Sequence, residues 1–131
     1  MKSPSTVLVV DDHPPNLALL THLLEIHGYD VMAANGAQEA MAAIAQKLPR
    51  LILMDLQMPG IDGFALTRML KASPPTAGVP IVAVTSFAMS GDKERALAAG
   101  CDDYVAKPID TRTLPLLVAR YVNGTPPSTT G

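Results

Sequence analysis

The chain has 131 residues, of which 48% are hydrophobic and 17% are charged, and its formal net charge is −2. This composition is typical of one globular domain, and the weak charge, without a stripe of Lys or Arg, argues against binding to nucleic acid or to an anionic membrane surface. No apolar run reaches the roughly 18 residues that a membrane-spanning helix needs, and the first residues lack the apolar segment of a secretion signal. The single cysteine, Cys101, suits a reducing compartment, so we expect a cytoplasmic protein.

Five short apolar runs predict the strands of a sheet. They are residues 6–10, 31–34, 51–55, 81–84 and 104–106. The runs at 6–10 and 51–55 are continuous rather than alternating, which indicates strands buried on both faces, as in a parallel sheet. The run at 31–34 is short and less apolar, so we expect it nearer an edge.

Helical spacing of apolar residues predicts one helix after each strand. Pro14 and Pro15 can open the first helix, because proline is tolerated in a first turn, and Gly28 is placed to end it. The stretch 73–78 is rich in Pro, Ser, Thr and Gly and is predicted to be a loop. The candidate caps of the second, third and fourth helices are Asn35, Asp62 and Ser90.

Five strands that alternate with five helices through short connections indicate a parallel sheet covered on both faces. We expect an α/β, doubly wound five-stranded sheet of order 2-1-3-4-5, in one domain over residues 6–122. Residues 1–5 would form an N-terminal extension. Residues 123–131 are rich in Pro, Ser, Thr and Gly and are predicted to be a disordered tail or a linker stub.

Polar residues that can perform chemistry follow these strands at their carboxyl ends. Asp11 and Asp12 follow the first strand, Asp55 ends the third, and Thr85 and Lys107 follow the fourth and fifth. Because the crevice of this strand order lies between strands one and three, we expect three carboxylates there, with a hydroxyl and an ammonium beside them. Each residue alone could be an ordinary turn, cap or surface residue. Their coincidence on one edge of the sheet indicates a site.

Crowded carboxylates repel one another, and a divalent cation relieves that repulsion. Hard oxygen ligands in a site open to phosphate and water favour Mg²⁺. The ion would screen Asp55 and hold phosphoryl oxygens, while Lys107 balances the remaining charge. Carboxylates also serve as nucleophiles in aspartyl-phosphate chemistry. The sequence therefore predicts that Asp55 accepts a phosphoryl group with the help of Mg²⁺.

Four motifs together resemble the receiver domain of two-component response regulators. They are Val10-Asp11-Asp12, Met54–Gly60, Val84-Thr85-Ser86 and Lys107-Pro108, and the resemblance spans residues 6 to about 121. The stretch Phe87–Asp92, with Gly100-Cys101 after it, is similar to single-domain receivers of the cell-division and polar-differentiation group. The run Asp11–Pro14 also resembles receivers attached to hybrid sensor kinases.

The resemblance implies a flavodoxin-like receiver fold and a phosphorelay in which Asp55 takes its phosphoryl group from a histidine kinase or a phosphotransfer protein. Mg²⁺ would be held by Asp12, Asp55 and the backbone carbonyl of Gln57, with Asp11 acting directly or through water. Lys107 would contact the phosphoryl group. Only self-phosphorylation and self-dephosphorylation would be expected, so the chain would not be an enzyme in the usual sense.

The resemblance also implies a switch. Thr85 would hydrogen-bond the phosphoryl group, and Tyr104 would then swing inward behind Thr85. This movement would change the surface made by the fourth helix, fifth strand and fifth helix, where a downstream protein partner would bind. The peptide between Lys107 and Pro108 would be cis.

The sequence departs from the receiver pattern at two positions. Ser86 follows Thr85 where a smaller Ala or Gly is common, so a second hydroxyl is expected near the phosphate. Pro115 lies inside a last helix that would otherwise run from about Asp110 to Tyr121. There it would remove a needed backbone N–H at a cost of about 3 kcal/mol. We therefore expect that helix to begin late, near Thr113, or to kink.

Other functions remain as alternatives. A phosphatase of the haloacid-dehalogenase type also uses an Asp that ends a strand, but it needs a second Asp two residues later, where this chain has Gln57. A flavodoxin would need a hydroxyl-rich phosphate loop after the first strand, where Asp11 and Asp12 would repel the cofactor. A receiver excised from a hybrid sensor kinase or a longer regulator is the serious alternative. A receiver-like scaffold that is never phosphorylated is a third.

Overall fold

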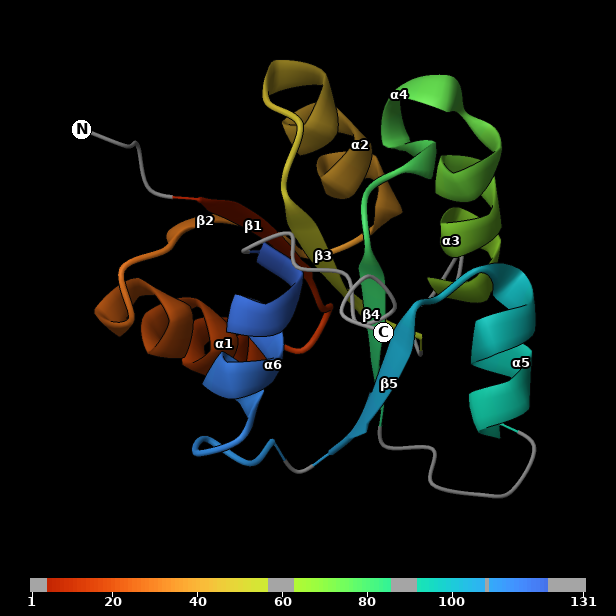
Figure 1. Cartoon of the computed structure of the whole chain (residues 1–131). Coiled ribbons are helices and arrows are strands. Elements are labelled where there is room, and N and C mark those ends of the chain that lie inside the picture. The colour runs from red at the N-terminus through yellow and green to blue at the C-terminus, as the bar shows by residue number, and fades with distance from the viewer. Residues whose placement is uncertain (1–4, 57–62, 86–91, 108, 123–131) are drawn as a thin grey trace.

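The computed structural model describes residues 5–56, 63–85, 92–107 and 109–122, and it contains a parallel sheet between two layers of helices (Figure 1). The strands pair in the order β2-β1-β3-β4-β5, which confirms the predicted doubly wound sheet. The less apolar strand β2 lies at an edge, as expected. The strand bounds are Thr6–Val10 for β1, Asp30–Ala34 for β2, Leu51–Asp55 for β3, Ile81–Thr85 for β4 and Asp103–Ala106 for β5.

Alternate residues of each strand pack against different layers of helices. Leu8 and Ile52 face the layer that contains α2 (Ala37–Gln46), α3 (Gly63–Ala72) and α5 (Asp92–Ala99), whereas Val9 and Leu53 face α1 (Pro14–Ile26) and α6 (Leu114–Val122). Figure 1 shows α1 and α6 together on one side of the sheet. Because both faces are covered, the inner strands are continuously apolar rather than alternating.

A sixth helix, α4 (Pro74–Ala77), lies within the stretch 73–78 that was predicted to be a loop, so that prediction is wrong. Pro74 and Pro75 occupy the first positions of this single turn, where their fixed φ suits a helix and their missing N–H groups cost nothing. The Thr76 hydroxyl donates to the carbonyl oxygen of Leu70, which holds the turn against the end of α3.

The carboxyl end of α1 and the amino end of α2 are stabilised in different ways. Gly28 follows α1 with φ +90°, a left-handed conformation that suits glycine and confirms the predicted helix end. The predicted cap at Asn35 is wrong, because Gly36 precedes α2 and no side chain caps it. Instead, the backbone N–H of Asn35 donates to the Glu39 Oε1 atom at 2.7 Å. Asp62 and Ser90, the other candidate caps, lie outside the described residues.

The last helix begins late, which confirms one of the two outcomes expected from Pro115. Helix α6 starts at Leu114, so Pro115 is its second residue, and the carbonyl oxygen of Thr113 accepts the backbone N–H of Leu117 at 3.1 Å. In this first turn the missing N–H of proline removes no intrahelical hydrogen bond.

Replacing Pro115 by Ala should lower the free energy of unfolding by about 0.4–1 kcal/mol, because proline already has the helical φ here and restricts the unfolded chain. Loss of the buried ring adds to the effect. Urea denaturation of the wild type and Pro115→Ala measures it. A proline in a helix interior would behave in the opposite way, so a stabilised variant would contradict the observed helix start.

The amino-terminal edge of the sheet carries a group of polar anchors. Lys71 Nζ lies 3.0 Å from Asp102 Oδ2 and donates to the carbonyl oxygen of Val79 at 2.8 Å. The Arg50 guanidinium donates to the carbonyl oxygen of Val122, the last residue of α6, at 3.0 Å. These contacts tie α3 and α6 to segments that are distant in sequence.

Tyr121 supplies a further anchor for α6. Its hydroxyl donates to Asp103 Oδ2 at 3.1 Å. Burial raises the pKa of Tyr121 to about 12, and the negative charge of Asp103 adds to the rise. The phenol therefore stays neutral in the folded protein at pH values where an ordinary tyrosine ionises.

Tyr121→Phe should reduce the free energy of unfolding by about 1 kcal/mol below pH 10, because one hydrogen bond is lost. A raised pKa in the folded state means that this advantage of the wild type is fully present below the unfolded pKa and is lost as the pH rises from about 10 to about 12. Thermal unfolding of both proteins from about pH 9 to about pH 11 should show their difference in Tm shrinking. A constant difference would contradict the assignment.

Within the described ranges, none of the helices combines the length and the apolar character that crossing a bilayer requires.

Candidate functional site

Three aspartates meet at the carboxyl edge of the sheet. Asp11 directly follows β1, Asp12 comes next, and Asp55 ends β3, the strand beside β1. One carboxylate oxygen from each of the three lies within 4.8 Å of those of the other two. Asp11 and Asp55 are 1% and 3% exposed, whereas Asp12 is more accessible to solvent. The three carboxylates that were predicted to meet between the first and third strands therefore do lie together.

Asp11 is held by both its backbone and its side chain. Its backbone N–H donates to the carbonyl oxygen of Ala34 at 3.0 Å, which continues the pairing of β1 with β2. Its Oδ1 atom accepts the backbone N–H of His13 at 2.8 Å, at the residue that precedes α1. The other oxygen of this carboxylate points to a cation.

That cation is Lys107. Its ammonium lies 3.1 Å from Asp11 Oδ2 and 3.7 Å from Asp55 Oδ2, so it bridges two buried carboxylates. The backbone N–H of Lys107 donates to the carbonyl oxygen of Thr85 at 2.8 Å. This bond extends the pairing of β4 with β5 by one residue and places the lysine at the same edge as the aspartates.

The charges at this edge do not balance. Among the described residues, the three carboxylates and the Lys107 ammonium sum to a formal charge of −2. Crowded carboxylate oxygens are the ligand type that Mg²⁺ prefers, and a divalent ion would cancel this residual charge. The residues present therefore fit a magnesium ion.

The two residues expected to form the switch lie near this edge. Thr85 ends β4 and is fully buried, and Tyr104, on β5, is half-buried. Because Tyr104 pairs with Ala83 and side chains alternate along a strand, Thr85 and Tyr104 lie on the same face of the sheet. Gln57, Ser86 and Pro108, including the expected cis peptide, lie outside the described residues.

Sequence reasoning missed Gly63, the first residue of α3. Its backbone N–H donates to the carbonyl oxygen of Leu56 at 3.3 Å. A Cβ atom at this position would lie 2.6 Å from the Leu56 Cα and even closer to the carbonyl oxygen of Asp55. The available signal was a glycine in the first turn of the predicted helix, where glycine has an entropic cost that a close approach of backbone to backbone can explain.

In the metal-free protein, Asp12→Asn should raise the free energy of unfolding by about 0.5 kcal/mol, because it removes one of three crowded negative charges. Asp11→Asn is the matched control and should not stabilise, since it weakens the pairing with Lys107 as well. Urea denaturation in the presence of a chelator measures both. An Asp12→Asn variant that is less stable than the wild type would refute the charge argument.

Comparison with known proteins identifies the family. Residues 7–119 match the model of the response regulator receiver domain. The polar-differentiation response regulator DivK of Brucella anthropi is 39% identical over 106 residues, which cover 81% of this chain and 86% of DivK. The sensor protein GacS of Pseudomonas syringae pv. syringae is 42% identical over 118 residues, or 88% of this chain, but the match spans only 13% of GacS.

Solved structures agree with these matches. A putative response regulator from Chloroflexus aurantiacus superposes with a TM-score of 0.87 at 32% identity, over 92% of this chain and 98% of that one. The receiver domain of the sensor histidine kinase PA1611 from Pseudomonas aeruginosa, which has a magnesium ion coordinated in its active-site cleft, gives 0.84 at 32% identity, over 92% and 99%. The chain therefore belongs to the receiver domain family of two-component response regulators.

Proposed function

We propose that this receiver accepts a phosphoryl group on Asp55 from a phosphohistidine of a histidine kinase or phosphotransfer protein. The observation that carries the proposal is the buried cluster in which Asp11 and Asp55 share the ammonium of Lys107. A carboxylate oxygen of Asp55 would form the new bond to phosphorus while the bond from phosphorus to the imidazole nitrogen breaks. As expected for a signalling family, the only reactions we propose are transfer to Asp55 and the later hydrolysis of the aspartyl phosphate.

Mg²⁺ would be held by Asp12, Asp55 and the backbone carbonyl of Gln57. When bound, the ion supplies positive charge that offsets the carboxylates and the incoming phosphoryl oxygens. Both oxygens of Asp11 already have partners, His13 N–H and Lys107, which favours the alternative that Asp11 acts through water. The magnesium in the cleft of the PA1611 receiver supports this part of the proposal.

The Lys107 ammonium would turn toward the phosphoryl group once Asp55 is phosphorylated. Its ammonium is already within 3.7 Å of Asp55, so only a small side-chain rotation is needed. A phosphoryl group adds nearly two negative charges, which favours the loop arrangement that can pair with them. The Thr85 hydroxyl would donate a hydrogen bond to the phosphoryl group. The Tyr104 side chain would then move into the space behind Thr85.

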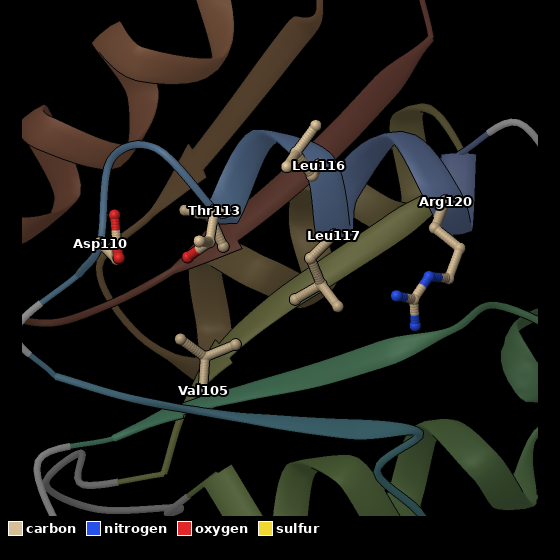
Figure 2. A pocket seen from close by; sticks show the side chains of 7 residues that line it. Val105, Asp110, Thr113, Leu116, Leu117 and Arg120 are labelled. Atoms are coloured by element: carbon tan, nitrogen blue, oxygen red, sulfur yellow. The ribbon is translucent and has the colours of Figure 1, made fainter.

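The output surface would be made by α5, β5 and α6, which correspond to the predicted fourth helix, fifth strand and fifth helix. A groove of about 360 Å³ lies between β5 and α6 on this surface (Figure 2). Leu117 and Val105 point toward one another in the groove, and Asp110 and Arg120 lie at its two ends. Leu116, which is 71% exposed, adds apolar area to the lining of the groove. This combination supports binding of a downstream protein partner.

The similarity to GacS favours a second candidate for the context of the domain. In that case the chain would be a receiver from a hybrid sensor kinase or a longer regulator, with the same chemistry at Asp55. The match to DivK, which covers 86% of that protein, favours a single-domain regulator. Family membership leaves no support for a haloacid-dehalogenase-like phosphatase.

Asp55→Asn should abolish labelling by acetyl phosphate and complex formation with beryllofluoride, because the amide is not a nucleophile. Intact-protein mass spectrometry and the loss of label after hydroxylamine treatment measure the acyl phosphate. Asp30→Asn, an exposed carboxylate on the edge strand β2, is the matched control and should label normally.

Chelation of magnesium should stop labelling of the wild type, and added Mg²⁺ should restore it. Labelling that survives in Asp55→Asn would reject the phosphoacceptor assignment. Labelling that proceeds equally well in the chelator would reject the magnesium site alone.

A further inference from the structure

We propose that Gly63 is a positioning residue for phosphoryl transfer. Because it has no side chain, the first turn of α3 can rest directly on the peptide between Asp55 and Leu56, which fixes the direction of the phosphoacceptor carboxylate. This inference rests on the proposed role of Asp55.

The contact joins backbone to backbone. Only the two Cα hydrogens of Gly63 separate α3 from the end of β3, and the hydrogen bond from Gly63 N–H to Leu56 O closes the contact at 3.3 Å. A Cβ atom would lie 2.6 Å from the Leu56 Cα, which is closer than packed carbon atoms can come. The clash cannot be relieved by rotating a flexible side chain, so either α3 or the peptide at 55–56 must move.

Helix α3 resists moving because it is fixed along its length. Leu66 and Thr67 are fully buried, and Leu70 is 1% exposed in the same core. At its far end, Lys71 is bound to Val79 and Asp102.

The first turn of α3 is also held. The ring of Phe64, the residue after Gly63, lies 4.5 Å from the guanidinium carbon of Arg95 on α5, in a cation–π contact. A side chain at position 63 would therefore displace the 55–56 peptide rather than the helix. The Asp55 carboxylate is attached to that peptide and lies in a crowded, nearly dry cluster, where a small displacement changes its distance to Lys107 and its alignment with an incoming phosphorus atom.

The test compares Gly63→Ala with Leu70→Ala and Gly78→Ala. Leu70→Ala destabilises the same helix without touching Asp55, and Gly78→Ala adds a methyl group where nothing lies within 4 Å. The initial rate of labelling by acetyl phosphate, per folded molecule and at saturating Mg²⁺, should fall at least about ten-fold in Gly63→Ala, because small misplacements of reacting groups cost that much or more. The two controls should stay within about three-fold of the wild type.

A positional readout separates this role from simple destabilisation. In ¹H–¹⁵N spectra, the amide resonances of Asp55 and Leu56 should shift in Gly63→Ala and stay in place in Leu70→Ala. Removing the Lys71 contacts at the far end of α3 should partly restore the rate of labelling. The double variant Gly63→Ala/Lys71→Met should label at least about three-fold faster than Gly63→Ala alone, although it is less stable, because the helix can then yield in place of the peptide.

Three results would overturn the inference. They are labelling of Gly63→Ala within about three-fold of the wild type, an equal loss in Leu70→Ala, and failure of Gly63→Ala to fold even with a stabilising osmolyte such as trimethylamine N-oxide. Failure to fold would show that the added methyl group disrupts the packing of the core instead of displacing the 55–56 peptide. If the wild type itself is not labelled, the proposed function fails. If the wild type is labelled and Gly63→Ala is labelled equally well, only the role of Gly63 fails.

Discussion

The structure depends on one ammonium placed between two carboxylates that water hardly reaches. Leaving Asp11 or Asp55 without a cationic partner at such low exposure would be costly, because a charge in a poorly solvated place needs an opposite charge or hydrogen bonds. The position of Lys107 is therefore coupled to the register of the sheet. Its backbone bond to Thr85 continues the pairing of β4 with β5, and a slip by one residue would turn the ammonium away from the cluster.

Most of the fold and the grouping of the aspartates could be predicted because they follow from patterns local to each strand. Continuous apolar runs such as Leu51–Met54 identify strands buried on both faces, and a polar residue at the end of such a run must lie at the edge of the sheet. The remaining features depend on contacts between segments. Thr76 stabilises α4 by reaching back to Leu70, and Glu39 binds the backbone of Asn35 in place of a conventional cap. The contact of Gly63 with Asp55 needs the packing of a helix on a strand, which no spacing rule encodes.

The two edges of the sheet have different mechanical properties. At the amino-terminal edge, Arg50, Lys71 and Tyr121 connect helices to distant backbone and carboxylate groups, so the ends of α3 and α6 are fixed there. At the carboxyl edge, the side-chain contacts of the described cluster centre on the Lys107 ammonium, which pairs with two of three crowded carboxylates. Under the proposed function, a phosphoryl group at that edge would rearrange the adjacent ends of the strands while the opposite edge keeps the layers together. Local stability that differs in this way between regions is what a switch requires.

Under the proposed function, the late start of α6 would affect which proteins can bind this domain. Residues 110–113 form an irregular turn, where a longer helix would have another helical turn. The Asp110 side chain accepts a hydrogen bond there from the backbone N–H of Arg112. A binding protein shaped for an uninterrupted helix would meet unmatched polar groups at this point and would lose affinity. Under the proposed function, Pro115 would thus restrict binding to proteins that fit a shortened last helix, which would limit cross-talk between pathways.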